Sequence, residues 1–193
     1  MGPEALLLSG ERVLAERSFL SRSAEATEAL GALLGSRLSP GSLVALHGEL
    51  GSGKTCLVRG LARGLGVEGD VASPTYTLMH HHPGPIPLYH LDAWMQGRGE
   101  AFLEDGGAEW LHASGVAAVE WAERVSPWIA GPRLAIALEH AGETERRVHL
   151  TAVGGPDPSA RAEALRALVE GLQPPPECSE LAPPLNPAED PAL

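Results

Sequence analysis

The feature that most constrains this chain is the octapeptide at residues 48–55, which reads GELGSGKT and fits the pattern G-x-x-x-x-G-K-[ST]. Residues 43–46 form a short apolar run that suits a buried strand, and the apolar residues after the octapeptide recur at helical spacing. A strand, a glycine-rich loop and a helix are the surroundings in which such a loop cradles phosphate groups. The sequence therefore predicts a nucleotide-binding loop. The alternative, a glycine-rich turn with a chance lysine, leaves eight matching positions unexplained.

The residue types in this octapeptide suit an anion. Gly48, Gly51 and Gly53 can turn tightly and let backbone N–H groups approach a phosphate with no side chain in the way. The helix expected to begin near Gly53 would point its positive end at the same place. Lys54 supplies a compact positive charge for the outer phosphates. Thr55 supplies a hydroxyl for a magnesium ion, which keeps several waters and takes few protein ligands.

The charge balance limits the partners of this chain. Its 193 residues carry a formal net charge of -11, from 14 basic and 25 acidic side chains, and 44% of them are hydrophobic. That composition is enough for a folded domain with a core. Because nucleic-acid binding depends on Lys and Arg at phosphates, we expect the chain to meet RNA only through a partner that carries it.

Two cysteines, Cys56 and Cys178, are too few and too far apart to predict a disulfide framework. We find no secretion signal and no apolar run of about 20 residues, so we expect a soluble cytoplasmic protein that does not span a membrane. Cys56 follows Thr55 at a helix start, where the pKa of a thiol can fall. We interpret it instead as a small residue beside the phosphate loop.

The pattern predicts a single domain over residues 1–172 and a disordered tail over residues 173–193. The tail holds seven of the 17 prolines and four acidic residues but no basic ones, so it cannot bury enough apolar surface to offset its ordering entropy. Within the domain, periodicity and turn signals predict an edge strand at 12–19, helices at 24–38, 101–112 and 159–172, a hairpin of 71–82 with 86–91, and strands at 116–119, 134–138 and 147–153.

Two acidic residues end apolar runs and are candidates for a catalytic site. Asp92 follows residues 86–91, and Glu120 follows residues 116–119. Functional groups of α/β proteins gather at the C-terminal ends of strands, so either carboxylate could face magnesium directly or through water. A lone carboxylate at a strand end more often caps a turn or forms a salt bridge, but the upstream phosphate loop favours a functional role for both.

Further polar and aromatic residues near these carboxylates need an interpretation. Residues 73–77 read SPTYT, whose hydroxyls could reach a γ-phosphate or its magnesium as a GTPase switch does, or could simply form an edge strand. His90 shares a face with Asp92 and is expected to orient Asp92 or the water near it.

We reject a metal site at residues 80–82, because consecutive strand side chains alternate faces. The four tryptophans are interpreted as packing residues.

Together these segments resemble one family. Residues 48–55, the SPTYTL segment at 73–78, the HLD segment at 90–92 and the VEWAER segment at 119–124 resemble, in order and rough spacing, the bacterial TsaE (YjeE) family. Its members are small ATPases of tRNA threonylcarbamoyladenosine biosynthesis. Many NTPases share the phosphate loop alone, but its combination with the other three segments is more specific. The resemblance covers about residues 20–155.

The resemblance implies an α/β, P-loop NTPase-like fold with a mixed, mainly parallel sheet flanked by helices. It implies ATP and Mg2+ as cofactors, with ATP held by Lys54 and its loop neighbours Glu49, Leu50, Gly51, Ser52, Gly53, Thr55 and Cys56.

The resemblance also implies roles outside the loop. Thr55 and Glu120 would hold the metal, and Lys54, Asp92 and Glu120 would act in hydrolysis. Thr75 would lie in the switch-like segment. The turn at Gly142 would lie near the nucleotide base, with Thr27 approaching it from the other side.

Partner proteins follow from the same resemblance. TsaE proteins work with TsaB and TsaD, and TsaD carries out the threonylcarbamoyl transfer. The ATPase would support or reset that complex without modifying tRNA itself. We therefore expect TsaB and TsaD homologues as partners, with tRNA reached only through them.

This sequence departs from the family pattern in two places within the shared region. Glu49 stands where the family usually has Asp, which preserves the charge. Ala93-Trp94-Met95 stands where the family shows x-Tyr-Arg, so the arginine is lost, and Arg98 could substitute for it.

Two other functional classes remain open on the same fold. A small-molecule kinase would consume ATP only with an acceptor present, but no arginine-rich lid insertion is visible. A non-hydrolytic, nucleotide-gated scaffold would use ATP binding to order residues 73–78 and promote docking.

Overall fold

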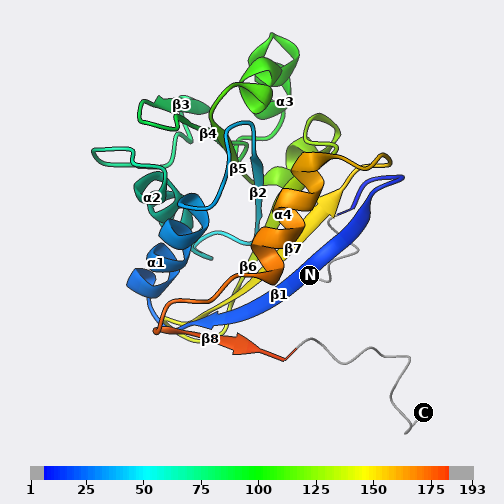
Figure 1. The fold of residues 1–193 in the computed structure, drawn as a ribbon. Coiled ribbons are helices and arrows are strands. Elements are labelled where there is room, and N and C mark those ends of the chain that lie inside the picture. Colours follow the sequence, from blue (N-terminus) through cyan, green and yellow to red (C-terminus); the bar gives the residue numbers. More distant parts are fainter. Residues whose placement is uncertain (1–6, 183–193) are drawn as a thin grey trace, which may run out of the picture.

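The fold is a single sheet with helices on both faces (Figure 1). The structure is a computed structural model that describes residues 7–182. Within that range the sheet has eight strands in the order β3-β4-β5-β2-β6-β7-β1-β8. The elements are β1 (Arg12–Ser21), α1 (Ala24–Gly35), β2 (Leu43–His47), α2 (Lys54–Gly64), β3 (Met79–His82), β4 (Leu88–Asp92), α3 (Arg98–Glu104), η2 (Gly107–His112), β5 (Val116–Glu120), η3 (Ala122–Trp128), β6 (Arg133–His140), β7 (Arg146–Gly154), α4 (Ala160–Glu170) and β8 (Cys178–Leu181).

The sheet is parallel at its centre and antiparallel at both edges. Strands β4, β5, β2 and β6 pair in parallel, whereas β3 pairs antiparallel with β4, and β7, β1 and β8 continue antiparallel from β6. Every residue of β2, β4 and β5 is buried, which is why these strands are continuous apolar runs in the sequence. The expected mixed α/β fold is confirmed, but the expectation of a mainly parallel sheet is wrong for the described residues: three strand pairings are parallel and four are antiparallel, because β3, β7, β1 and β8 extend the parallel centre as antiparallel neighbours.

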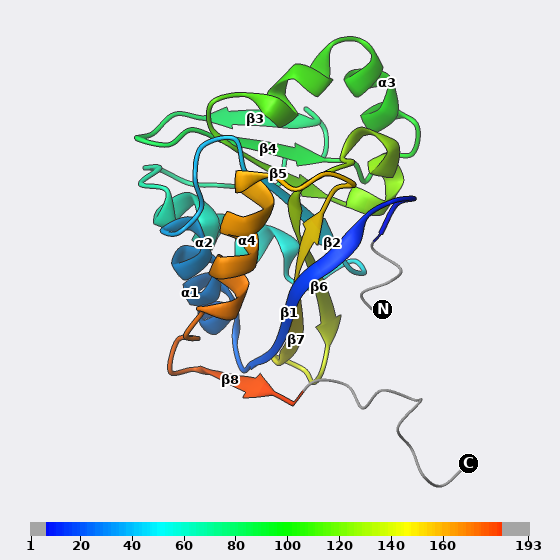
Figure 2. The same cartoon turned by 45° about the vertical axis from the view of Figure 1, so that its right-hand side comes forward.

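Alternate residues of the central strands enter two separate cores. Val44 and Leu46 of β2 pack with α1, α2 and α4, while Leu43 and Ala45 pack with α3, η2 and η3 on the opposite face. Figure 2 shows α1, α2 and α4 together on one side of the sheet. The sheet is thus the middle layer of three, and side chains at its C-terminal edge emerge beside the start of α2.

Helices α1 and α2 pack backbone to backbone through glycines. A Cβ atom on Gly31 or Gly35 of α1 would lie 2.3 Å from a carbonyl oxygen of α2. A Cβ atom on Gly60 or Gly64 of α2 would lie 2.0 or 2.1 Å from a carbonyl oxygen of α1. Neither helix can carry a side chain at these contacts without moving apart. The glycine contact therefore fixes where α2 begins relative to the sheet.

The substitution Gly60→Ala tests this contact. Alanine raises intrinsic helix propensity by about 1 kcal/mol, but overpacking a close contact costs about 1–3 kcal/mol, and here the clash involves backbone on both sides. We expect a net loss in the free energy of unfolding, measured by urea denaturation. Gly155→Ala is the control, because its added Cβ would meet no atom closer than 3.7 Å. Equal stability of both variants would contradict the close approach.

Several sequence predictions need correction at this level. The hairpin of β3 with β4 is confirmed, but β3 begins only at Met79, and residues 71–78 form coil and turn. The helix predicted at 101–112 is two short helices, α3 and η2, separated at Gly106, whose φ of 103° breaks the helix. The strand predicted at 12–19 extends to Ser21 and lies inside the sheet, because β8 covers it.

The tail prediction is wrong for part of residues 173–193. Residues 178–181 form β8, which pairs antiparallel with β1 and buries Cys178. Arg17 of β1 donates two hydrogen bonds, of 2.7 and 2.6 Å, to the carboxylate of Glu180. Backbone pairing with β1 and the bidentate ion pair stabilise this segment, although its composition alone predicts disorder. Residues 183–193 lie outside the described residues.

A buried ion pair joins the N-terminal segment to β6. Both oxygens of Glu11 accept hydrogen bonds from Arg133, at 2.6 and 2.8 Å, and the two side chains are 3% and 2% exposed. Burial alone would raise the pKa of Glu11, but Arg133 and the N–H groups of Leu8 and Gly131 lower it below its ordinary value. Glu11 therefore stabilises the fold in its charged form.

The lowered pKa of Glu11 predicts acid sensitivity. Its contribution to the free energy of unfolding is fully present above the ordinary carboxyl pKa and is lost as the pH falls through the lowered one. Glu11→Gln should cost about 3–5 kcal/mol near neutral pH, as expected when one partner of a buried pair is removed, and should flatten the acid side of the stability curve. Denaturation between pH 7 and pH 3 measures both effects, and an unchanged acid slope would contradict the assignment.

Candidate active site

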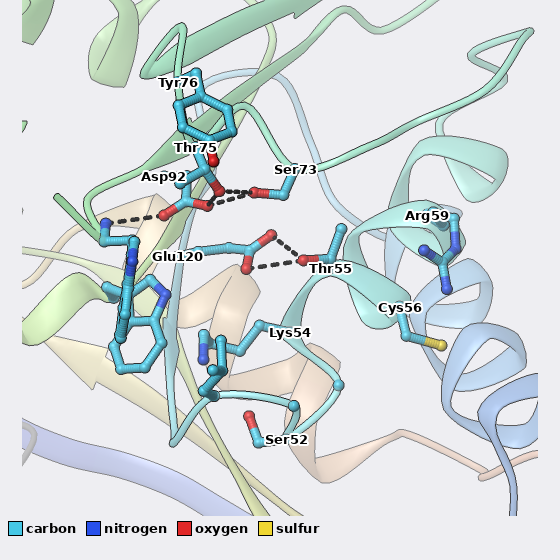
Figure 3. A pocket seen from close by; sticks show the side chains of 15 residues that line it. Ser52, Lys54, Thr55, Cys56, Arg59, Ser73, Thr75, Tyr76, Asp92 and Glu120 are labelled. Carbon is cyan, nitrogen blue, oxygen red and sulfur yellow. Dashed lines mark hydrogen bonds between the residues drawn. The ribbon is translucent and has the colours of Figure 1, made fainter.

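A cavity of about 450 Å³ opens where β2, β4 and β5 end (Figure 3). Residues 50–56 line one side, and Ser73, Thr75, Asp92 and Glu120 line the other. The parallel register sets this arrangement, because Glu120 of β5 is paired with both Leu46 of β2 and Asp92 of β4. The carboxylates predicted from two apolar runs therefore share one cavity with the glycine-rich loop.

The loop has the conformation that only glycines allow easily. The φ angles of Gly48, Gly51 and Gly53 are 137°, 74° and 105°. A Cβ atom on Gly48 would also lie 2.3 Å from the carbonyl oxygen of Leu138. The sequence prediction of a tight turn is confirmed in its geometry.

The start of α2 has the features of an anion site. Ser23 and Ser159 cap α1 and α4 with their side chains, but Gly53 offers α2 no side-chain cap. The hydroxyl of Ser52 is buried and has no hydrogen-bond partner among the described residues. Uncapped N–H groups and an unpartnered hydroxyl at one helix N-terminus fit a phosphate group.

Lys54 lies inside the loop. Its Nζ donates hydrogen bonds to the carbonyl oxygens of Gly48 and Glu49, at 2.6 and 2.9 Å, and lies 3.7 Å from the ring centre of Trp121. Burial lowers the pKa of Lys54, and the carboxylates of Glu120, Glu123 and Asp92 oppose that shift. The ammonium group thus stabilises the loop from within and remains next to the cavity.

Thr55 and Glu120 are in direct contact. The hydroxyl of Thr55 lies 2.8 and 3.0 Å from the two oxygens of Glu120, and Nε2 of His90 lies 2.8 Å from the first. Within residues 7–182, no three His, Cys, Asp or Glu side chains form a metal-holding group. A hydroxyl and one carboxylate nevertheless fit Mg2+, which takes one or two carboxylates and completes its shell with waters and phosphate oxygens.

Asp92 has a different set of partners. Its Oδ2 accepts hydrogen bonds from the hydroxyls of Ser73 and, at 2.7 Å, Thr75, and its Oδ1 accepts one from the N–H of Trp94 at 2.8 Å. The segment predicted to act as a switch therefore holds Asp92 directly. The expectation that His90 orients Asp92 is wrong, because the hydrogen bond of His90 goes to Glu120, whereas an effect of His90 on a water near Asp92 stays a prediction.

Of three further predicted residues, Cys56 lines the cavity, whereas Glu49 and Arg98 do not. The thiol of Cys56 donates to the carbonyl oxygen of Ala24 at 3.1 Å, and burial raises its pKa, as suits a packing residue rather than a reactive one. Glu49 contributes its carbonyl oxygen to Lys54 but does not line the main cavity. Arg98 is exposed and donates to Met95, so it does not replace the missing arginine at the cavity.

The two residues expected near a nucleotide base are only partly brought together. Thr27 lines a smaller cavity of about 210 Å³ with Gly53, Cys56, Glu143, Thr144 and Arg146. Gly142 does not line it, although its turn supplies Glu143 and Thr144. This cavity shares Gly53 and Cys56 with the main one, so the two adjoin at the start of α2.

Arg146 and two tryptophans were missed as site residues. Arg146 of β7 donates to the carbonyl oxygens of Ser52 and Gly51, at 3.1 and 3.2 Å, and no sequence motif marks it. Trp94 and Trp121 line the cavity with ring centres 4.5 Å apart, so they do more than fill a core. In the sequence Trp94 follows Asp92-Ala93 and Trp121 follows Glu120, and this proximity to the two carboxylates could have identified both rings as site residues.

The fold and the loop geometry place this chain in the P-loop NTPase-like class of α/β proteins. Among residues 7–182, no helix is long and apolar enough to cross a membrane.

Similarity to known proteins identifies the family within this class. The profile of the family described as "Threonylcarbamoyl adenosine biosynthesis protein TsaE" matches residues 21–148. The tRNA threonylcarbamoyladenosine biosynthesis proteins TsaE of Treponema pallidum and Bacillus subtilis are 38% and 40% identical over 67% of this chain, and over 96% and 82% of their own lengths. The crystal structure of Bacillus subtilis YdiB matches with a TM-score of 0.66 and 30% identity, over 81% of this chain and 95% of that one. The chain belongs to the TsaE family, as the sequence motifs predicted.

Proposed function

We propose that this chain binds ATP with Mg2+ and hydrolyses the γ-phosphate, as an accessory protein of tRNA threonylcarbamoyladenosine modification. The observation that carries the proposal is the meeting of the glycine-rich loop with Asp92 and Glu120 in one cavity. Each group comes from the C-terminal end of a different central strand, where α/β proteins place their catalytic groups.

In this proposal the phosphates occupy the loop. Backbone N–H groups of residues 51–55 and the positive end of α2 bind the β- and γ-phosphates, and the Ser52 hydroxyl gains a partner. Lys54 exchanges its carbonyl contacts in the loop for phosphate oxygens. Thr55 and Glu120 hold the magnesium ion, which when bound would neutralise charge on the β- and γ-phosphates.

Asp92 is the group that acts on water. Its carboxylate accepts a hydrogen bond from a water molecule in line with the γ-phosphate. The water oxygen then attacks phosphorus, the bond from phosphorus to the β-phosphate oxygen breaks, and the water proton passes to Asp92 or to the phosphate. Ser73 and Thr75 fix the carboxylate, so the segment at 73–78 links nucleotide state to catalytic geometry.

The names of the relatives supply the pathway. They are called tRNA threonylcarbamoyladenosine biosynthesis proteins, and we propose the same pathway for this chain, in the cytoplasm, with homologues of TsaB and TsaD as partners. A net charge of -11 supports contact with tRNA through those partners rather than directly. The P-loop ATPase domain proposed over residues 1–172 would carry this activity.

One observation favours the scaffold alternative. Tyr76 is 83% exposed at the cavity, in the segment that holds Asp92. Nucleotide binding could reposition this ring for a partner without any need for hydrolysis.

Lys54→Ala tests nucleotide binding. Removing the ammonium group should lower ATP affinity by about 10- to 150-fold, since hydrogen bonds to charged groups contribute about 1.5–3 kcal/mol. Isothermal titration calorimetry with MgATP measures the change. Arg98→Ala is the control, because that exposed residue lies outside the cavity. Wild-type affinity in the Lys54→Ala protein would remove the assignment.

Asp92→Ala separates hydrolysis from scaffolding. We expect MgATP binding to persist and ATP turnover to fall by at least the factor of about 10²–10⁴ that a positioned acid–base group contributes. The variant is then added to TsaB and TsaD homologues, and both complex size and tRNA modification are followed. Loss of modification with complex formation retained supports hydrolysis as the function. Full modification without turnover would favour the scaffold.

A further inference from the structure

Two buried carboxylates lie side by side at the edge of the sheet. Asp92 and Glu120 are register partners across the parallel pair β4 and β5, and they are 2% and 3% exposed. Two negative charges on neighbouring strands repel each other, and the repulsion is stronger where burial reduces screening by water. Figure 3 shows that the two side chains turn to different partners, Asp92 to Ser73 and Thr75 and Glu120 to Thr55. Something must hold Glu120 in that orientation.

His90 is the residue behind Glu120. Its side chain is fully buried, and its Nε2 lies 2.8 Å from Oε1 of Glu120. An ionised carboxylate only accepts hydrogen bonds, so Nε2 is the donor. Oε1 then accepts from both His90 and Thr55, at 2.8 Å each, whereas Thr55 lies 3.0 Å from Oε2. The more weakly held oxygen is the one left for a further ligand.

The position of His90 in the sheet explains this contact. His90 is two residues before Asp92 on β4, so both side chains leave the same face of the sheet. Glu120 stands beside them on β5 and meets His90 on the diagonal. The Nδ1 atom of His90 has no hydrogen-bond partner among the described residues. Burying an imidazole with one unpaired nitrogen costs free energy, and within residues 7–182 the hydrogen bond of this ring goes to Glu120.

We propose that His90 is a positioning residue that orients Glu120 as a magnesium ligand, a role that rests on the proposed function. A hydrogen bond from imidazole fixes the carboxylate rotamer toward Thr55 and away from Asp92. The residue that holds a metal-ligating carboxylate affects metal affinity by about 10- to 100-fold. His90 therefore sets the Mg2+ concentration that nucleotide binding requires, and it does not touch the nucleotide.

The test compares His90→Leu, which removes the donor, with His90→Gln, whose amide can still donate. His81→Gln is the matched control, because His81 is exposed on the neighbouring strand β3 and stacks on Tyr89 instead. ATP binding is measured by calorimetry without magnesium and across a MgCl2 titration. Thermal unfolding is recorded for each variant. Where His90→Leu does not fold, His90→Asn replaces it, because its shorter amide stops short of Glu120.

We expect His90→Leu to raise the MgCl2 concentration for half-maximal enhancement of ATP binding by about 10- to 100-fold. ATP affinity without magnesium should be unchanged, because the loop and Lys54 are intact. His90→Gln should recover part of the loss, and His81→Gln should match the wild type. A magnesium requirement unchanged in His90→Leu would overturn the proposal. So would an equal loss of affinity with and without magnesium, which a merely structural role would give.

The wild-type protein separates this inference from the proposed function. If MgCl2 does not alter its ATP binding, the magnesium assignment of Thr55 and Glu120 fails, and the role of His90 fails with it. If MgCl2 strengthens wild-type binding and His90→Leu responds identically, only the positioning role fails.

Discussion

The parallel register of β4, β5 and β2 is the constraint on which the site depends. It aligns Asp92, Glu120 and Leu46 in one row, so that the loop after β2 begins beside the ends of the two strands that carry the carboxylates. A shift of one residue in any of these pairings would turn a carboxylate to the opposite face, into the core beneath α3 and η3. The apolar residues of the central strands therefore position the polar ones. Packing on both faces makes the register unambiguous, and the chemistry at the edge follows from it.

Asp92 and Glu120 place two like charges at this edge of the sheet, and each carboxylate is stabilised by its own hydrogen-bond partners. Asp92 is satisfied by two hydroxyls and an N–H group, and Glu120 by one hydroxyl and one imidazole. Lys54 lies close enough for both carboxylates to act on its pKa. Its own hydrogen bonds, however, go to loop carbonyl oxygens. The three charged groups are thus held near one another without closing into salt bridges that an incoming ligand would have to break.

The parts of this site that could be predicted are those marked by a short pattern in the sequence. The loop, Asp92 and Glu120 could be predicted because a motif and two apolar runs mark them within a few residues. The partner of His90 could not, because strand alternation gives the face of a side chain but not which neighbouring strand it meets. Arg146 reaches Gly51 and Ser52 across more than 90 residues of sequence, with no motif to show it. Strand β8 was missed for a related reason, since its order comes from β1 and Arg17 rather than from its own composition.

Backbone strain marks the same two carboxylates. Among the described residues, only Leu78 and Trp121 have positive φ angles without being glycine, at 66° and 58°. Trp121 directly follows Glu120, and the carbonyl oxygen of Leu78 accepts the backbone hydrogen bond of Asp92 at 2.9 Å. Each such conformation costs on the order of 1–3 kcal/mol and persists only where surrounding contacts enforce it. At Trp121 the turn brings the indole over Lys54, and at Leu78 it ends the segment whose hydroxyls hold Asp92. Both strained turns therefore lie next to the two carboxylates, and the contacts that enforce them are the same contacts that fix Lys54 and Asp92.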